Sequence, residues 1–166
     1  MDLQKDFHKY NLIIGWGVFL IALITYGLSV EPTVSFWDCG EYIATSAKLE
    51  VGHPPGAPFF QMVGAFFASF SPSPEMTALF VNFISVFSSA FTILFLYFII
   101  VNLTKKIALS QKEMLSNGQV ITLYGSGVVG ALAYTFSDSF WFNATEAEVY
   151  AMAMLFMSTM FWPFRP

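Results

Sequence analysis

The sequence predicts an all-α integral membrane protein with about four transmembrane helices. Of its 166 residues, 56% are hydrophobic and 19% are aromatic, which is more apolar surface than a soluble domain of this size can bury. Several uncharged stretches are also long enough to cross a bilayer. The net charge of −4 argues against nucleic acid as a partner. A lipid bilayer is therefore the expected surroundings of most of the chain.

The spans are expected at residues 12–29, 77–103, 120–136 and 149–164. The first of these carries no charge, and Trp16 and Tyr26 near its ends suit the two membrane interfaces. The second lies within 29 uncharged positions, residues 76–104, and is the strongest candidate. By contrast, the apolar run 58–70 is short and is bounded by prolines. We expect it to lie in the interface or to re-enter the membrane, so that residues 30–76 form one outer loop with interfacial helices.

The distribution of charge predicts the topology. With these four spans, six of the seven basic residues fall on the side of the N-terminus, and Lys48 alone falls on the other. The six are Lys5, Lys9, Lys105, Lys106, Lys112 and Arg165. Basic residues favour the cytoplasmic side, so both termini are expected there, with loops 30–76 and 137–148 outside.

The stretch of residues 35–58 holds most of the candidate chemistry. Ser35 is expected to cap a helix that ends near Gly52, before the turn His53-Pro54-Pro55. Asp38 and Glu41 are three positions apart, so they share one face of that helix. The pair is either the polar face of an interfacial helix or a reactive site in which repulsion raises the pKa of one carboxyl to suit a general base.

Other polar residues of the outer loops have two interpretations each. His53 either caps the proline turn or binds a phosphate or positions a carboxylate, and Lys48 is the other cation available for a phosphate. Glu146 and Glu148 either end a helix on the water side or join Asp38 and Glu41 around a metal ion. No ligand-spacing motif supports a metal, so none is predicted. The run 125–130 matches G-x-G-x-x-G, but it lies inside an uncharged span and predicts close helix packing instead of a dinucleotide site.

Three motifs together resemble the GT-C superfamily of membrane glycosyltransferases. They are F-W-D-C-G-E-Y at 36–42, G-H-P-P-G-A-P at 52–58 and A-E-V-Y at 147–150. The nearest branch is the protein O-mannosyltransferases, and the wording is similar to a bacterial inner-membrane family related to them. The resemblance runs from the first span to about residue 159.

The resemblance implies an inverting transfer of a sugar, expected to be mannose, from a polyprenyl phosphate to a protein Ser or Thr hydroxyl. It assigns Asp38 as the catalytic acid of the first outer loop and Glu41 as its neighbour. It assigns substrate binding to His53, Pro54 and Pro55. To these we add Lys48, Glu146 and Glu148 as substrate-binding residues. The active face is then periplasmic, and no cofactor is expected beyond the lipid-linked donor, with the need for a divalent metal left open.

The chain is accordingly expected to be the N-terminal part of a GT-C-like enzyme of the bacterial inner membrane, inactive alone. The rival from another class is a non-enzymatic multi-span protein, either a transporter fragment or an assembly subunit. A transporter is expected to bury ionisable residues at mid-membrane. In this sequence the long spans are uncharged and the acids gather on one side, which favours chemistry at the membrane surface.

Overall fold

A computed structural model describes residues 4–110 and 114–162, and within them all regular secondary structure is helical. Lys112, Arg165 and the last two residues of the expected span 149–164 lie outside the described residues. The expectation of an all-α fold is confirmed for the part described. The helices are α1 Phe7–Ser29, α2 Cys39–Lys48, α3 Pro58–Ala68, α4 Thr77–Ser110, α5 Asn117–Thr135, α6 Asp138–Ala144 and α7 Val149–Phe161, with a 3₁₀ turn at Pro74–Met76.

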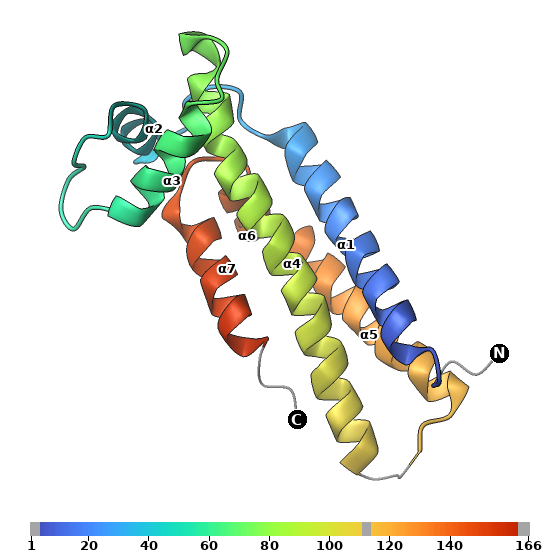
Figure 1. Ribbon diagram of the computed structural model, residues 1–166. Coiled ribbons are helices and arrows are strands. Elements are labelled where there is room, and N and C mark those ends of the chain that lie inside the picture. Colours follow the sequence, from blue (N-terminus) through green and yellow to red (C-terminus); the bar gives the residue numbers. More distant parts are fainter. Residues whose placement is uncertain (1–3, 111–113, 163–166) are drawn as a thin grey trace.

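Helix α4 is the centre of the fold. It packs against α1, α5 and α7 along its length, while α2 and α3 lie beside its first turns (Figure 1). Its buried face carries Val86, Ile93 and Tyr97, which join Ala22 and Tyr26 of α1 in the main hydrophobic core. The long helices α1, α4 and α5 therefore pack together along their length, and the short helices α2 and α3 lie beside the first turns of α4.

The number of helices long enough to cross a membrane is smaller than predicted. Helix α1 and the unit 74–110 qualify by length and composition, and α5 with α6 forms a third candidate that bends by 69°. The apolar helices α3 and α7 have 11 and 13 residues, whereas a straight span needs about 20. Two to three membrane-length helices are thus established, and four crossings remain a prediction.

Helix α4 also continues further than the hydropathy pattern indicates. The sequence predicts a span that ends at residue 103, but the helix runs to Ser110 and includes Lys105 and Lys106. The difference arises because hydropathy marks where a helix leaves lipid, not where the helix ends. Lysine, alanine and leucine all have good helix propensity, and no glycine or proline interrupts the segment.

Two glycines of α5 allow it to approach α4 closely. A Cβ added at Gly127 would lie 2.5 Å from a methyl carbon of Val101 and 2.8 Å from the ring of Tyr97. A Cβ at Gly130 would lie 2.6 Å from Ile100 Cδ1. The prediction that the glycine run 125–130 serves helix packing is therefore confirmed at these two positions.

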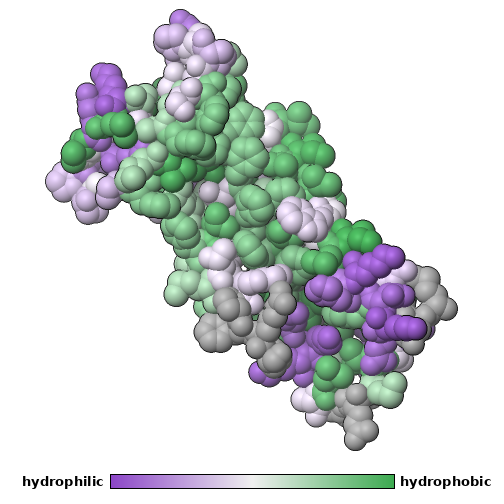
Figure 2. Space-filling model, in the orientation of Figure 1, coloured by the Kyte–Doolittle hydropathy of each residue, from purple (hydrophilic) through white to green (hydrophobic). Residues whose placement is uncertain are grey.

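The polar residues lie at the two ends of the bundle. Figure 2 shows hydrophilic side chains at both ends and a hydrophobic surface between them. At one end, Lys105 Nζ lies 4.2 Å from the centre of the Phe7 ring, so the end of α4 meets the start of α1. The opposite end carries α2, α3 and α6, and we call it the acidic end because Asp38, Glu41, Glu146 and Glu148 lie there (Figure 1).

This arrangement gives a test of the topology. A cysteine introduced at Asp138, which is exposed at the acidic end, should react with an impermeant maleimide added outside intact cells. A cysteine at Lys106, exposed at the other end, should react only after permeabilisation. The native Cys39 is buried and gives a low background. Labelling at 106 from outside without labelling at 138 would reverse the predicted orientation.

Candidate functional site

Three ionisable side chains meet at the acidic end. Glu41 Oε1 accepts the backbone N–H of His53 at 2.5 Å, and Glu41 Oε2 lies 2.6 Å from His53 Nδ1. The other ring nitrogen, Nε2, lies 3.9 Å from Asp38 Oδ2. One imidazole thus stands between two carboxylates, and we call Asp38, Glu41 and His53 the carboxylate–histidine cluster.

The local chain path that builds this cluster differs from the predicted one. The helix begins at Cys39 and ends at Lys48, not near Gly52. Leu49 ends it in the left-handed conformation, with φ of 54°, and its N–H bonds to Ser46 O at 3.3 Å. Glu50 N–H then bonds to Thr45 O at 2.9 Å, which turns the chain back toward the helix. Because α2 ends early, the chain turns back and brings His53 into contact with Glu41.

A second left-handed residue precedes the helix. Trp37 has φ of 61°, an uncommon conformation for a bulky side chain, and it lies directly before Asp38. Such backbone strain is maintained only where the surrounding structure requires it. The turn at Trp37 and the turn at Leu49 together set the two ends of α2. Sequence rules that assign left-handed residues to glycine or asparagine give no sign of either.

The charges of the cluster support one another. The hydrogen bond from the His53 ring lowers the pKa of Glu41, and the hydrogen bond to Glu41 raises the pKa of His53. The charge of Asp38 raises the pKa of His53 further. Glu41 is therefore a weak base that holds the turn, and His53 is a cation over a wider pH range. Asp38 is the more exposed of the two carboxylates.

The same cluster is the set of residues best suited to hold a metal ion. One ligand atom each from Asp38, Glu41 and His53 lie within 4.8 Å of one another. Two oxygens and an imidazole nitrogen suit several divalent ions. However, His53 Nδ1 is already engaged by Glu41, so a metal would have to replace that contact or bind Nε2.

Glu146 and Glu148 are buried, in contrast to the predicted water-side position. Their exposed fractions are 3% and 6%. Ser35 donates a hydrogen bond to Glu146 Oε2, so its hydroxyl does not cap α2 as predicted. Burial raises the pKa of Glu146, and burial with the charges of Glu146 and Asp38 raises that of Glu148 to about 7. Glu148 thus changes protonation near neutral pH, close to Asp38.

This burial predicts a pH-dependent stability. The folded pKa of Glu148 is above that of a free carboxyl, so the stabilisation is present below about pH 4.5 and is lost as pH rises through about 7. The variant Glu148→Gln stays neutral, so at high pH its free energy of unfolding should exceed that of the wild type by on the order of 1–3 kcal/mol. Thermal unfolding at pH 5 and pH 8 measures this, with the exposed Glu50→Gln as control. Equal pH dependence of Glu148→Gln and the wild type would contradict it.

The remaining predicted binding residues lie further along the outer loop. Lys48 is the last residue of α2, and the helical rise separates its α-carbon from that of Asp38 by about 15 Å. His53, Pro54 and Pro55 form an exposed turn, closed by a hydrogen bond from Gly56 N–H to His53 O at 2.8 Å. Lys48 is thus separated from Asp38 by the length of α2. Pro54 and Pro55 directly follow His53 of the carboxylate–histidine cluster.

Sequence reasoning missed Asn82, near the start of α4. It is fully buried and contacts both outer loops. The signal that could have indicated it is an amide among uncharged residues at one end of the strongest span, since polar groups in membrane helices usually have a specific partner.

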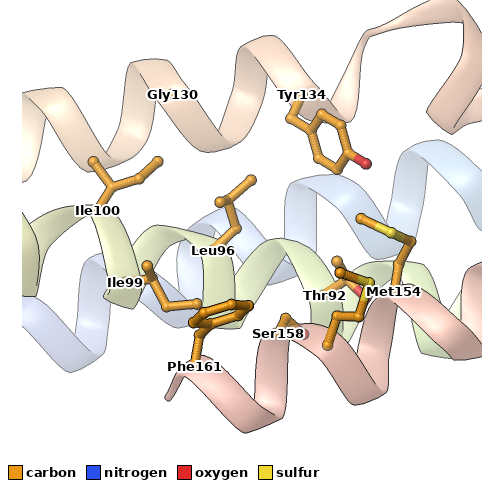
Figure 3. A pocket seen from close by; sticks show the side chains of 10 residues that line it. Thr92, Leu96, Ile99, Ile100, Gly130, Tyr134, Met154, Ser158 and Phe161 are labelled. Atoms are coloured by element: carbon orange, nitrogen blue, oxygen red, sulfur yellow. The ribbon is translucent and has the colours of Figure 1, made fainter. Parts of the chain in front are cut away.

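A cavity of about 450 Å³ lies between α4, α5 and α7, away from the acids (Figure 3). Its lining is almost wholly apolar and includes Leu96, Tyr134, Met154 and Phe161. None of its lining residues is an acid, a base or a histidine. This cavity therefore offers no carboxylate, lysine, arginine or histidine for acid–base chemistry.

Comparison with known proteins identifies the family of the chain. The profile of the family "Protein O-mannosyl-transferase TMEM260 N-terminal domain" matches residues 38–165. The chain belongs to this family. The match begins at Asp38 and contains every candidate site residue, and it confirms the resemblance to protein O-mannosyltransferases.

One relative supports the TMEM260 assignment. The protein O-mannosyl-transferase tmem260 of Dictyostelium discoideum is 26% identical over 144 residues, which are 86% of this chain. Those residues are 16% of that relative, so the chain spans about a sixth of its length. No solved structure matches the chain significantly. The family supports glycosyl transfer to protein at a general level, and the donor and the roles of single residues are matters for proposal.

Proposed function

We propose that the full-length protein transfers a sugar, expected to be mannose, from a polyprenyl phosphate to a Ser or Thr hydroxyl of an acceptor protein. The transfer takes place at the acidic end, on the outer face of the bacterial inner membrane, in a GT-C-type catalytic domain. The observation that carries this proposal is the carboxylate–histidine cluster at one end of a membrane bundle in the TMEM260 family.

In the proposed step Asp38 is the general base. Its carboxylate takes the proton of the acceptor hydroxyl while the hydroxyl oxygen forms a bond to the anomeric carbon. The bond from that carbon to the phosphate oxygen breaks on the opposite side, and the polyprenyl phosphate leaves with the electron pair. The configuration is inverted, and no redox partner is needed. Of the two carboxylates in the cluster, that of Asp38 is the more exposed and has the longer contact to His53.

His53 and Glu41 are proposed to assist the leaving group. A protonated imidazole at the headgroup level offers a charged donor to the phosphate, and its raised pKa keeps it protonated over a wider range. Glu41 orients the ring and holds the proline turn. Lys48, Pro54 and Pro55 are proposed to contact the substrate, and Glu146 and Glu148 to border the acceptor side. Of the rival interpretations, transport is disfavoured because the only buried charged residues of the described part, Glu146 and Glu148, lie at the acidic end.

The test uses the purified full-length protein with a Ser/Thr-rich peptide. Polyprenyl-phosphate mannose should increase the peptide mass by one hexose, and a nucleotide-linked mannose should not. Chelation of divalent ions decides whether a metal is needed. Transfer from the nucleotide sugar alone would contradict the proposed donor, and no transfer from any lipid-linked sugar would contradict the reaction class.

A further inference from the structure

Asn82 makes hydrogen bonds to two stretches that are far apart in sequence, residues 31–39 and residue 147. Its Nδ2 donates to Glu31 O at 2.7 Å and to Thr33 O at 3.0 Å. Its Oδ1 accepts the N–H of Ala147 at 2.8 Å and lies 3.8 Å from Cys39 Sγ, which can donate to it. A carboxamide has two N–H donors and one oxygen with two lone pairs, so the group is fully used.

Two of these contacts, those to Cys39 and Ala147, are next to an acid of the site. Cys39 directly follows Asp38, and Ala147 lies between Glu146 and Glu148. The segment Glu31–Thr33 leads from α1 toward Ser35, which itself donates to Glu146. Glu31 N–H bonds to Thr145 O at 2.9 Å, which joins the same two outer loops beside Asn82. One side chain of α4 therefore contacts both acid-bearing outer loops, through backbone atoms at residues 31, 33 and 147 and through the side chain of Cys39.

We propose that Asn82 is the positioning residue that fixes the Asp38 segment and the Glu146–Glu148 segment relative to one another. Its catalytic consequence rests on the proposed function, since Asp38 must reach an acceptor hydroxyl that Glu146 and Glu148 border. Helix α4 is the central and most extensively packed helix, so it gives both loops a common fixed point. A misplacement of about 1 Å at a reacting group can reduce a rate by about 10²-fold.

The side chain must donate and accept at once. Leucine at position 82 keeps the branched shape of the side chain but leaves two carbonyls and one N–H without their partner in a buried place. These backbone groups can then form hydrogen bonds only with water, and water reaches them only if the two outer loops open. Asn11 is a suitable control because it is also a buried asparagine, in α1, and its Oδ1 has no hydrogen-bond partner.

The first readout does not depend on activity. In the full-length protein, infrared titration follows the protonated carboxyl band that is absent from Glu148→Gln. Asp38 and Glu146 face Glu148, as do Tyr42 and Cys39 of α2. The wild type should titrate near pH 7, and Asn82→Leu should titrate closer to 4.5 because water reaches the loosened segment. Asn11→Leu should match the wild type, and an unshifted band in Asn82→Leu would overturn the inference.

The second readout is sugar transfer by the same proteins. Asn82→Leu should lose about 10²-fold in kcat with little change in the KM for donor, whereas Asn11→Leu should keep its kcat. If Asn82→Leu does not fold, Asn82→Ser serves, because one hydroxyl cannot replace two N–H donors. Active protein with an unchanged kcat in either Asn82 variant refutes the positioning role. A shifted band in Asn82→Leu, together with no transfer by the wild-type protein, refutes the proposed function and leaves the fixing of the loops in place.

Discussion

Replacement of Asp38 by asparagine should abolish most sugar transfer by the full-length protein. The amide keeps the size and hydrogen bonding of the side chain but cannot take a proton from the acceptor hydroxyl. Loss of a general base typically costs about 10²–10⁴-fold in rate. Donor binding should be largely retained, because in our proposal the phosphate is held by His53. Steady-state transfer and donor binding, measured on the same preparation, separate the two effects.

Asp138→Asn is the matched control for this variant. Asp138 is an exposed aspartate at the same end of the bundle, in the first turn of α6, and it is not part of the carboxylate–histidine cluster. Its amide variant should transfer sugar at close to the wild-type rate. Near-normal turnover by Asp38→Asn would show that the base is another group, with Glu148 as the next carboxyl to test because its pKa is about 7.

Gly64→Ala should destabilise the outer helices by about 1–3 kcal/mol, the usual cost of overpacking. A Cβ at this position of α3 would lie 2.6 Å from Ser46 Cβ of α2, too close for either atom to remain in place. The Ser46 side chain is completely buried and short, so it cannot move aside. Helix α2 must then shift, and it carries the cluster residue Glu41. Limited proteolysis of loop 30–76 and thermal unfolding should both show the loss.

Gly17→Ala is the control for that prediction. A Cβ at Gly17 of α1 meets no atom within 4 Å, so alanine should be neutral or slightly stabilising through its better helix propensity. Equal stability of the two variants would mean that α2 and α3 do not pack as described.

The sequence predicts the parts of this fold that follow local rules. Uncharged length indicates α1 and α4, and the short proline-bounded run 58–70 corresponds to the 11-residue α3. The spacing of Asp38 and Glu41 predicts a shared helix face, and their ligand oxygens lie within 4.8 Å of one another. Each of these features depends on residues close together in the chain. The roles of these acids remain predictions.

Long-range partners account for what the sequence does not predict. Ser35 is an ordinary helix cap by local rules, yet it donates to Glu146, 111 positions away. Asn82 and Ala147 are 65 positions apart. The burial of Glu146 and Glu148 follows from the packing of loop 145–148 on α2 and α4, which no spacing rule contains. Their raised pKa values are a consequence of that packing and could not be read before it.

Sided transfer by the full-length protein in sealed proteoliposomes tests the central claim most directly. Orientation is first determined by maleimide labelling at position 138, and polyprenyl-phosphate mannose is present in both leaflets. The account predicts that an acceptor peptide added outside gains hexose in proportion to the fraction of molecules whose acidic end faces outward, and that Asp38→Asn protein in the same orientation adds almost none. Transfer in proportion to the opposite orientation, or undiminished transfer by Asp38→Asn, would contradict a catalytic site at the acidic end.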